Sequence, residues 1–283
     1  MKILVTGTNG QVGHALMQEL TEHELIALTR QDCDLTNSDQ IRQVIDQHQP
    51  ELIINPAAYT QVDQAEDEPE LAFQINRDVP RVMAEKAREY SIPFIHFSTD
   101  YVFDGKKDDA YNENDKTNPL GVYGQSKLEG EEAIKKVGGF FYIFRTSWVY
   151  SNIGHNFYMT IKNLSQEKSE LRVVDDQYGA PTSNAFIARQ IKSIIPQLSI
   201  NNVGTYHLVP EGFCSWHDFA RDIIKKTNPE FDLYQLSKIK SLDYPTKALR
   251  PKNSRLSHEK IKQAFMLKFD SWHSELDRII DES

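Results

Sequence analysis

The chain opens with Lys2-Ile-Leu-Val-Thr6, which runs directly into the turn Gly7-Thr-Asn-Gly10-Gln-Val-Gly13. The short apolar run with β-branched residues predicts a buried strand, and the apolar spacing from Ala15 to Leu20 predicts a helix. A strand, a glycine-rich turn and a helix form the first half of a βαβ unit. Because the glycines lie between the first strand and the first helix, they indicate a dinucleotide-binding turn rather than an ordinary connection.

Each of the three glycines has its own task in such a turn. Gly7 permits the tight turn, Gly10 lets a pyrophosphate approach the backbone, and Gly13 lets the helix pack closely on the strand. The anion then lies at the positive end of the helix dipole. The spacing Gly-x-x-Gly-x-x-Gly resembles that of the short-chain dehydrogenase/reductase superfamily.

The second predicted strand ends where the adenosine ribose of a dinucleotide is expected. An acidic residue there suits the ribose hydroxyls of NAD, whereas an arginine suits the 2′-phosphate of NADP. This chain places Arg30 after the strand, and the first acid follows only at Asp32. A solvated loop arginine is the alternative interpretation. We expect NADPH as the cofactor, with NADH tolerated.

Composition excludes several other classes of protein. Of the 283 residues, 39% are hydrophobic and 26% are charged, which is typical of a globular protein. The net charge of −9 argues against binding of nucleic acid, and no apolar run approaches the roughly 20 residues of a membrane helix. There is no signal-peptide pattern, and two cysteines, Cys33 and Cys214, are too few for a disulfide framework. These features predict a cytoplasmic protein.

Strand and helix patterns alternate through the first half of the chain. Further strands are expected at 51–55, 92–97 and 140–145, with helices at 38–48, 68–90 and 123–136. This alternation predicts an α/β fold with a Rossmann-type, doubly wound parallel sheet. Beyond Trp148 the pattern loosens, and a smaller mixed α/β substrate-binding domain is expected. We assign residues 1–147 and a returning segment at about 183–210 to the NAD(P)-binding domain, and about 148–182 and 211–283 to the substrate-binding region.

Two predicted strand ends carry residues suited to a ligand. Small residues in Pro56-Ala57-Ala58-Tyr59-Thr60 would let a cofactor lie against the backbone, and the next strand delivers Ser98-Thr99-Asp100. Ligands of open α/β sheets bind at the carboxyl ends of the strands. The polar segment 104–118 is expected to be a surface loop that could move over a site.

The strongest catalytic pattern is Tyr123 followed four residues later by Lys127 on a predicted helix, so both side chains project from one face. A free tyrosine has a pKa of about 10, and a neighbouring ammonium is expected to lower that pKa. Tyr123 would then protonate a carbonyl oxygen as a hydride arrives, while Thr99 orients that oxygen. The same spacing recurs at Tyr158/Lys162 and Tyr234/Lys238, which we expect to be chance surface pairs.

Six segments together resemble the dTDP-4-dehydrorhamnose reductase family over essentially the whole chain. They are Gly7 to Gly13, Ser98-Thr-Asp-Tyr-Val-Phe-Asp-Gly105, Tyr123 to Lys127, Arg145-Thr-Ser-Trp-Val-Tyr150, Asp176-Gln-Tyr-Gly-Ala-Pro-Thr182 and Arg250-Pro-Lys-Asn-Ser-Arg-Leu256. The resemblance implies reduction of the C4 ketone of dTDP-4-dehydro-6-deoxy-L-mannose to dTDP-L-rhamnose, the last step of dTDP-rhamnose biosynthesis, by NADPH or NADH.

The resemblance also implies residue roles. Tyr123 is the proton donor, Lys127 its partner and Thr99 the group that orients the carbonyl. Asp100 and Trp148 would contact the sugar. The cofactor would be lined by Gly10, Gln11, Val12, Arg30, Asp34, Leu35, Ala58, Tyr59 and Thr60, together with Tyr123 and Lys127. Asn156, Arg250 and Arg255 are candidates for the nucleotide diphosphate, with surface roles as the alternative.

One departure from the family concerns oligomerisation. Some members form a metal-bridged dimer through carboxylates, and the matching positions here are Ala15, Ala185 and Arg189. None of these can ligate magnesium, so we expect no metal site, and a monomer or a dimer built without a metal bridge.

Other functions stay open at this stage. A dehydratase of this superfamily has Asp-Glu after the threonine, whereas this chain has Thr99-Asp100-Tyr101, and epimerases are usually longer. The sequence therefore favours a reductase over a dehydratase or an epimerase. A reductase or epimerase of another nucleotide sugar, and a non-catalytic regulatory subunit with the same fold, are the remaining alternatives.

Overall fold

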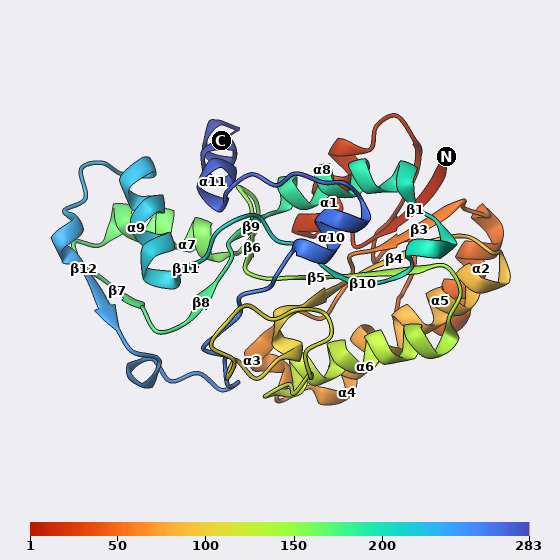
Figure 1. Cartoon of the computed structure of the whole chain (residues 1–283), viewed down its shortest axis with the longest axis horizontal. Helices are drawn as coiled ribbons and strands as arrows, with labels where there is room; N and C mark the ends of the chain where they lie inside the picture. Colours follow the sequence, from red (N-terminus) through yellow and green to blue (C-terminus); the bar gives the residue numbers. More distant parts are fainter. Residues whose placement is uncertain (283) are drawn as a thin grey trace.

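A six-stranded parallel sheet forms the centre of the protein in the computed structural model, which describes residues 1–282 (Figure 1). The strand order is β10-β5-β4-β3-β1-β2, and every neighbouring pair is parallel. The strands are β1 (Lys2–Thr6), β2 (Glu24–Leu28), β3 (Leu52–Asn55), β4 (Phe94–Thr99), β5 (Phe141–Thr146) and β10 (Gly204–His207). The predicted doubly wound sheet is confirmed, and the returning strand at its edge is β10.

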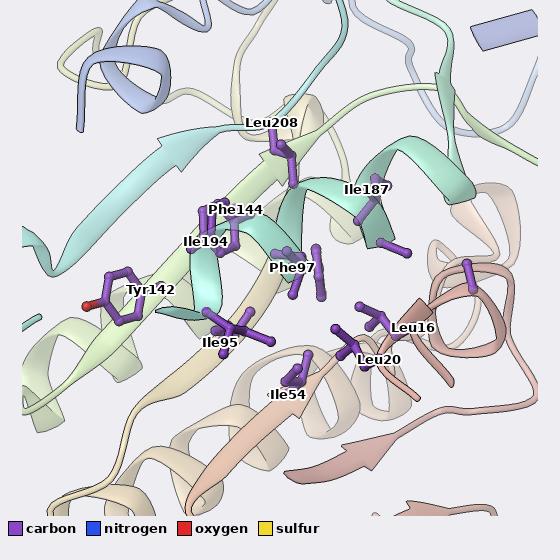
Figure 2. Close-up of a cluster of buried hydrophobic side chains, with 14 of the residues drawn as sticks. Leu16, Leu20, Ile54, Ile95, Phe97, Tyr142, Phe144, Ile187, Ile194 and Leu208 are labelled. Atoms are coloured by element: carbon purple, nitrogen blue, oxygen red, sulfur yellow. The ribbon is translucent and has the colours of Figure 1, made fainter. Parts of the chain in front are cut away.

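Helices cover both faces of the sheet, as the parallel connections require. One face carries α1 (Gln11–Glu19) and α8 (Asn184–Ile194), and the other carries α2 (Ser38–His48), α5 (Val79–Glu89) and α6 (Val122–Val137). Figure 2 shows the core beneath α1 and α8, where Leu16, Phe97, Phe144 and Ile187 pack together. Most strand residues are fully buried because both faces are covered.

The switch point of the sheet lies at β1. The chain leaves β1 towards β2 on one side, whereas β3, β4, β5 and β10 extend the sheet on the other. The connections after β1 and after β3 therefore diverge, and the carboxyl ends of the strands at such a switch point are the usual ligand site of these sheets.

The helix predicted at 68–90 is present but is not α-helical throughout. It consists of α4 (Pro69–Phe73), the π-helix η1 (Gln74–Asp78) and α5. The apolar stripe continues through all three segments, so periodicity alone did not reveal the π-helical turn. The wide turn of η1 rotates Asn76 into the interior, where its side chain is fully buried. Single π turns of this kind are frequent at functional sites.

The remaining elements build a smaller lobe beside the sheet (Figure 1). Its helices α7 (Phe157–Glu167), α9 (Trp216–Thr227) and α11 (Trp272–Asp281) enclose a separate hydrophobic cluster. Short strands pair as β6 (Val149–Tyr150) with β9 (Thr182–Ser183), β7 (Leu171–Val174) with β12 (Leu236–Ile239), and β8 (Tyr178–Gly179) with β11 (Cys214–Ser215). The other helical segments are α3 (Val62–Ala65), α10 (Glu259–Ala264) and the 3₁₀ turns η2 (Asp100–Val102), η3 (Ile195–Gln197), η4 (Ile200–Asn202), η5 (Leu233–Gln235) and η6 (Ser241–Asp243).

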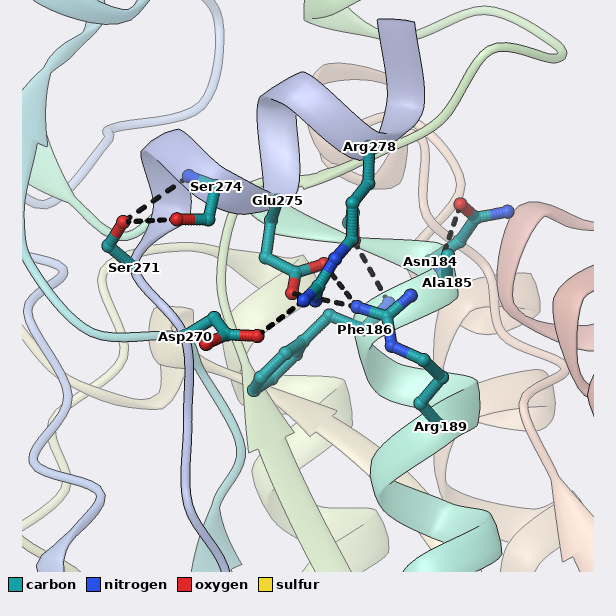
Figure 3. Close-up of polar contacts among 10 residues, drawn as sticks. Asn184, Ala185, Phe186, Arg189, Asp270, Ser271, Ser274, Glu275 and Arg278 are labelled. Carbon is teal, nitrogen blue, oxygen red and sulfur yellow. Dashed lines mark hydrogen bonds and ion pairs between the residues drawn. The ribbon is translucent and has the colours of Figure 1, made fainter. Parts of the chain in front are cut away.

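The last part of the chain contributes to both lobes. Ile261, Phe265 and Phe269 pack into the core of the large sheet, although residues 211–283 were assigned to the substrate-binding region. Glu275 of α11, which is 1% exposed, accepts hydrogen bonds from Arg189 at 2.5 and 2.7 Å and from Ser183 at 3.0 Å (Figure 3). These contacts tie α11 to the start of α8.

The segment 104–118 is fixed to the body of the protein rather than free. Tyr111 stacks on Phe103 with ring centroids 4.2 Å apart and bridges to Leu256. Asn253 Nδ2 donates to two carbonyl oxygens of this segment, at 2.6 and 2.8 Å. Among residues 1–282, none of the helices combines the length and apolar composition needed to cross a membrane.

Candidate active site

The glycine-rich turn has the geometry that its sequence predicted. Gly7 adopts φ +58°, which favours glycine, and a Cβ there would lie 2.9 Å from Ala57 Cα. A Cβ on Gly13 would lie 2.2 Å from Gly7 O, so only glycine lets α1 approach β1 this closely. Gly10 is the N-cap of α1 and makes no side-chain cap hydrogen bond. The first amides of α1, at Gln11 and Val12, therefore lack intrahelical partners and suit an anion.

Gln11 links this turn to the smaller lobe. Its Oε1 accepts hydrogen bonds from Ser151 Oγ at 2.7 Å and from Asn156 Nδ2 at 3.0 Å. Asn156 Oδ1 also accepts from the amide of Met159 and thereby caps α7. Both ends of the Asn156 amide are thus engaged within the protein. Asn156, a predicted diphosphate contact, thus bridges Gln11 and the start of α7.

The loop after β2 carries one cation, Arg30, that has no hydrogen-bond or ion-pair partner in the part of the chain that the structure describes. Asp34 accepts from the backbone amide and the hydroxyl of Thr36, and the Thr36 hydroxyl is the main cause of a lowered pKa for Asp34. Asp32 is similarly bound to Thr29. Arg30 is exposed beside them and forms no ion pair within residues 1–282. Leu35 packs on the core below.

Asn76 positions the loop after β3. Its Nδ2 donates to the carbonyl of Tyr59 at 3.1 Å and to Ser126 Oγ at 3.0 Å, and its Oδ1 accepts from the Tyr59 amide at 2.9 Å. Ala57, Ala58 and Thr60 lie in the same loop, which faces the glycine-rich turn through Ala57 and Gly7. Sequence analysis missed Asn76; the available signal was an asparagine next to Ile75 in an otherwise apolar stripe.

Tyr123 and Lys127 lie on the first two turns of α6, beside the end of β4. The ring of Tyr123 packs edge-on against Tyr101 with centroids 5.5 Å apart. Burial raises the pKa of Tyr123 to about 12, with Asp100 adding to this rise and a side-chain hydrogen bond with Thr99 opposing it. The expected lowering of this pKa by Lys127 is therefore not seen; the hydroxyl stays protonated at neutral pH.

Lys127 is turned towards the sheet. Its Nζ donates to Phe97 O at 2.6 Å and lies 3.4 Å from His96 Nε2, with the side chain 2% exposed. Burial lowers the pKa of Lys127 to about 8, and Glu131 on the next turn of α6 opposes this shift. These contacts explain why the ammonium does not lower the pKa of the tyrosine.

A buried carboxylate lies next to the tyrosine. Asp100 Oδ1 accepts from Thr99 Oγ1 at 3.0 Å, whereas Oδ2 has no hydrogen-bond partner within residues 1–282. Burial raises the pKa of Asp100 to about 6, and the side chains of Ser254 and Thr99 oppose the rise. A buried acceptor without a partner suits a donor such as a sugar hydroxyl.

Trp148 marks the entry into the smaller lobe and adopts φ +50°, which is strained for a side chain of this size. Its indole stacks on Trp216 with centroids 3.5 Å apart and an interplanar angle of 10°. A Cβ on Gly179 would meet the same indole at 2.6 Å. Sequence analysis did not identify Trp216 or Gly179, because neither lies near Trp148 in the chain.

The two C-terminal arginines differ in their environment. Arg250 donates from Nη1 and Nη2 to the two carboxylate oxygens of Asp63, at 3.1 and 2.8 Å. Both charges act on the nearby Tyr101, whose pKa is raised mainly by burial: Arg250 opposes this rise and Asp63 adds to it. Arg255 instead donates to Asn253 Oδ1 at 2.8 Å and to the carbonyl of Asp108. It supports segment 104–118, which is the surface role named as its alternative.

The two other Tyr-x-x-x-Lys pairs are outside this region. Tyr158 is fully buried and belongs to the hydrophobic cluster of the smaller lobe. The expectation of a surface pair was therefore wrong at this position. Tyr234 is 96% exposed. Within residues 1–282 there is no group of three or more His, Cys, Asp or Glu side chains that could hold a metal ion.

A glycine-rich turn at the switch point of a parallel sheet, with a Tyr-x-x-x-Lys pair at the neighbouring strand end, defines the class of Rossmann-type short-chain dehydrogenase/reductase proteins. Comparison with known proteins narrows this class. The model of one family, described as the RmlD substrate binding domain, matches residues 1–283. The chain belongs to this family.

Relatives of known name align with this chain over nearly its full length. A dTDP-4-dehydrorhamnose reductase of Sinorhizobium fredii is 39% identical over 289 residues, covering 99% of this chain and 97% of that protein. The enzyme of the same name from Escherichia coli K12 is also 39% identical, covering 100% and 98%. The crystal structure of dTDP-4-dehydrorhamnose reductase from Bacillus anthracis in complex with NADP superimposes with a TM-score of 0.94, at 35% identity and full coverage of both chains.

Proposed function

We propose that this protein is an NAD(P)H-dependent reductase that converts dTDP-4-dehydro-6-deoxy-L-mannose to dTDP-L-rhamnose. The observation that carries the proposal is the position of Tyr123 beside Thr99 at the end of β4, on the helix that also carries Lys127. The full-length identity with reductases of this name supports the substrate. A cytoplasmic location is part of the proposal, supported by two buried free cysteines.

The residues present fit a dinucleotide. The uncapped amides of Gln11 and Val12, and the absence of room for any side chain at Gly7 and Gly13, suit a pyrophosphate at the start of α1. Arg30 would meet the 2′-phosphate of NADP, a cofactor present in the B. anthracis structure. The rest of the cofactor site would be formed by Gly10, Asp34, Leu35, Ala57, Ala58, Tyr59, Thr60, Tyr123 and Lys127. The dihydronicotinamide ring supplies the hydride.

The protein's own residues supply the proton and the orientation. Because the pKa of Tyr123 is about 12, the hydroxyl carries its proton at neutral pH and can donate it to the C4 oxygen as that oxygen becomes an alkoxide. Thr99 would donate to the same oxygen and fix its position. Lys127, with a pKa of about 8, is mainly an ammonium at pH 7. It would stabilise the negative charge left on Tyr123 only by turning its Nζ away from Phe97 O and His96.

Substrate contacts are assigned on the same geometry. Asp100 Oδ2, buried and without a partner in the described residues, would accept from a sugar hydroxyl. Trp148 presents an indole held in place by Trp216, which suits packing against a sugar ring. Arg250 would meet the diphosphate only by releasing Asp63 in part. Asn156 would act indirectly, by fixing Gln11.

The two lobes divide the work in this proposal. Residues 1–147 with about 183–210 would hold the dinucleotide, and about 148–182 with 211–283 would hold the nucleotide sugar, although 261–269 support the large sheet. For the oligomer we propose a monomer, or a dimer without a metal bridge. Ala15 and Ala185 offer no ligand, and Arg189 is ion-paired with Glu275. Light scattering that reveals a dimer which EDTA dissociates would contradict this.

The test follows absorbance at 340 nm with NADPH and with NADH, using dTDP-4-keto-6-deoxyglucose plus a 3,5-epimerase. Tyr123→Phe should reduce kcat by about 10²- to 10⁴-fold with little change in KM, because only the proton donor is lost. Tyr234→Phe is the matched control, since it removes the hydroxyl of an exposed Tyr-x-x-x-Lys pair. Absence of oxidation by the wild type, with NADPH still bound, would favour another nucleotide sugar or a regulatory subunit.

A further inference from the structure

A continuous chain of buried polar side chains runs beneath Lys127. Thr6 Oγ1 donates to Asn55 Oδ1 at 2.6 Å, Asn55 Nδ2 lies 3.1 Å from His96 Nδ1, and His96 Nε2 lies 3.4 Å from Lys127 Nζ. Thr6, Asn55 and His96 are all fully buried. Their order follows the sheet, because β1, β3 and β4 are neighbours and Asn55 pairs in register with His96. None of these three residues contacts the proposed reacting groups except through Lys127.

The donors and acceptors of this chain fit only one charge state of Lys127 at a time. When Asn55 Nδ2 donates to His96 Nδ1, a neutral imidazole carries its proton on Nε2. That N–H can donate to Lys127 only if the lysine is an amine with a free lone pair. An ammonium needs the opposite arrangement: Lys127 donates to Nε2, Nδ1–H donates to Asn55 Oδ1, and Asn55 Nδ2 donates to Thr6 Oγ1.

Each link in the chain is able to reverse. The asparagine amide presents a donor and an acceptor that exchange by a half-turn, the imidazole has two neutral tautomers, and the threonine hydroxyl both donates and accepts. Burial also keeps the imidazole neutral, because it holds the pKa of His96 well below its usual value, with Lys127 as a second cause. The chain can therefore satisfy Lys127 in both charge states without a second buried charge.

We propose that His96, oriented by Asn55 and Thr6, is a positioning residue whose tautomer reverses when Lys127 gains or loses its proton. The inference rests on the proposed function only in assigning that proton exchange to turnover, since Tyr123 must regain the proton that it gives away. Besides His96, the charged group facing Lys127 is Glu131 on the same helix. The charge of Glu131 is balanced by Arg145 of β5, at 2.7 and 2.8 Å.

Nuclear magnetic resonance of the full chain tests the proposal without any sugar substrate. Spectra of protein labelled with ¹⁵N in histidine report which ring nitrogen of His96 is protonated, and ¹³Cε of lysine reports the titration of Lys127. The His96 signal is identified by its loss in His96→Gln. We expect Nδ1–H below about pH 8 and Nε2–H above it, with both curves sharing one midpoint. A tautomer that stays constant while Lys127 titrates would overturn the proposal.

Asn55→Asp provides a second measurement. An acceptor-only side chain fixes Nδ1–H, so the ammonium keeps its acceptor while the amine loses its donor. The new negative charge acts in the same direction, so the pKa of Lys127 should rise by about one pH unit or more. The pH at which kcat falls, which we expect to follow the loss of the Lys127 ammonium, should rise by the same amount. His207→Leu is the matched control, because His207 is equally buried on β10 and neither ring nitrogen has a partner in residues 1–282. It should move neither value.

The outcomes separate the two proposals. An unchanged lysine titration in folded Asn55→Asp would contradict the reversing chain even if the reductase is fully active. A reversing tautomer in a protein that does not reduce the sugar would support the hydrogen-bonded series beneath Lys127 and contradict the proposed function. If Asn55→Asp does not fold, the wild-type tautomer curve decides alone.

Discussion

Substitution of alanine at two glycines of the first turn should separate packing from cofactor binding. In Gly13→Ala the new Cβ would lie 2.2 Å from Gly7 O and 2.8 Å from Thr8 Cα, both backbone atoms that no rotamer change can move. In Gly10→Ala the nearest atom is Gly7 O at 3.2 Å, and φ −85° is an allowed extended conformation. The two changes add the same methyl group three residues apart.

The expected free energies differ accordingly. Overpacking against rigid backbone costs up to about 3 kcal/mol. The gain in helix propensity from glycine to alanine returns about 1 kcal/mol, so Gly13→Ala should lower the free energy of unfolding by about 2 kcal/mol. Gly10→Ala should cost no more than about 1 kcal/mol, as a poorer N-cap. Both should weaken NADPH binding by about 10- to 100-fold, because at least one charge-assisted hydrogen bond to the diphosphate is displaced.

Urea unfolding followed by circular dichroism gives the stability, and NADPH fluorescence gives the affinity. Gly10→Ala that binds NADPH as tightly as the wild type would refute the approach of a pyrophosphate at this residue. Unchanged stability of Gly13→Ala would refute the close packing of α1 on β1.

Three further changes test other parts of the structure. Arg30→Ala should raise the KM for NADPH about 10-fold or more while leaving the KM for NADH within about 2-fold, since only the 2′-phosphate contact is lost; equal effects on both would contradict the assignment. Because the pKa of Lys127 is lowered to about 8, the ammonium is lost above that value, and kcat should fall as the pH rises from about 7 through about 8; a profile flat from pH 7 to pH 10 would argue against a charged lysine. Glu275→Leu should destabilise the fold by about 3 kcal/mol, because two guanidinium groups lose a buried carboxylate (Figure 3); a urea midpoint unchanged from wild type would show that these bonds do not hold α11 in place.

Local patterns in the sequence predicted the elements that depend on local physics. The strand–glycine–helix start and the alternation of strands and helices were both evident from spacing and residue type. The π-helix η1 was not, because its apolar stripe matches that of a regular helix. The wide turn directs Asn76 into the interior, where its partners Tyr59 and Ser126 come from distant parts of the chain.

The sequence by itself determined the class of fold, the family and the residue types of the candidate site, since these are written in short motifs at strand ends. Only the tertiary structure decided how those residues are used. Lys127 lies against His96 rather than beside the tyrosine hydroxyl, Arg250 pairs with Asp63 across 187 positions, and Trp148 takes φ +50° to reach Trp216. The physical reason is that hydrogen bonding, burial and the pKa shifts that follow depend on which side chains meet across strands, and no periodicity within one segment records that.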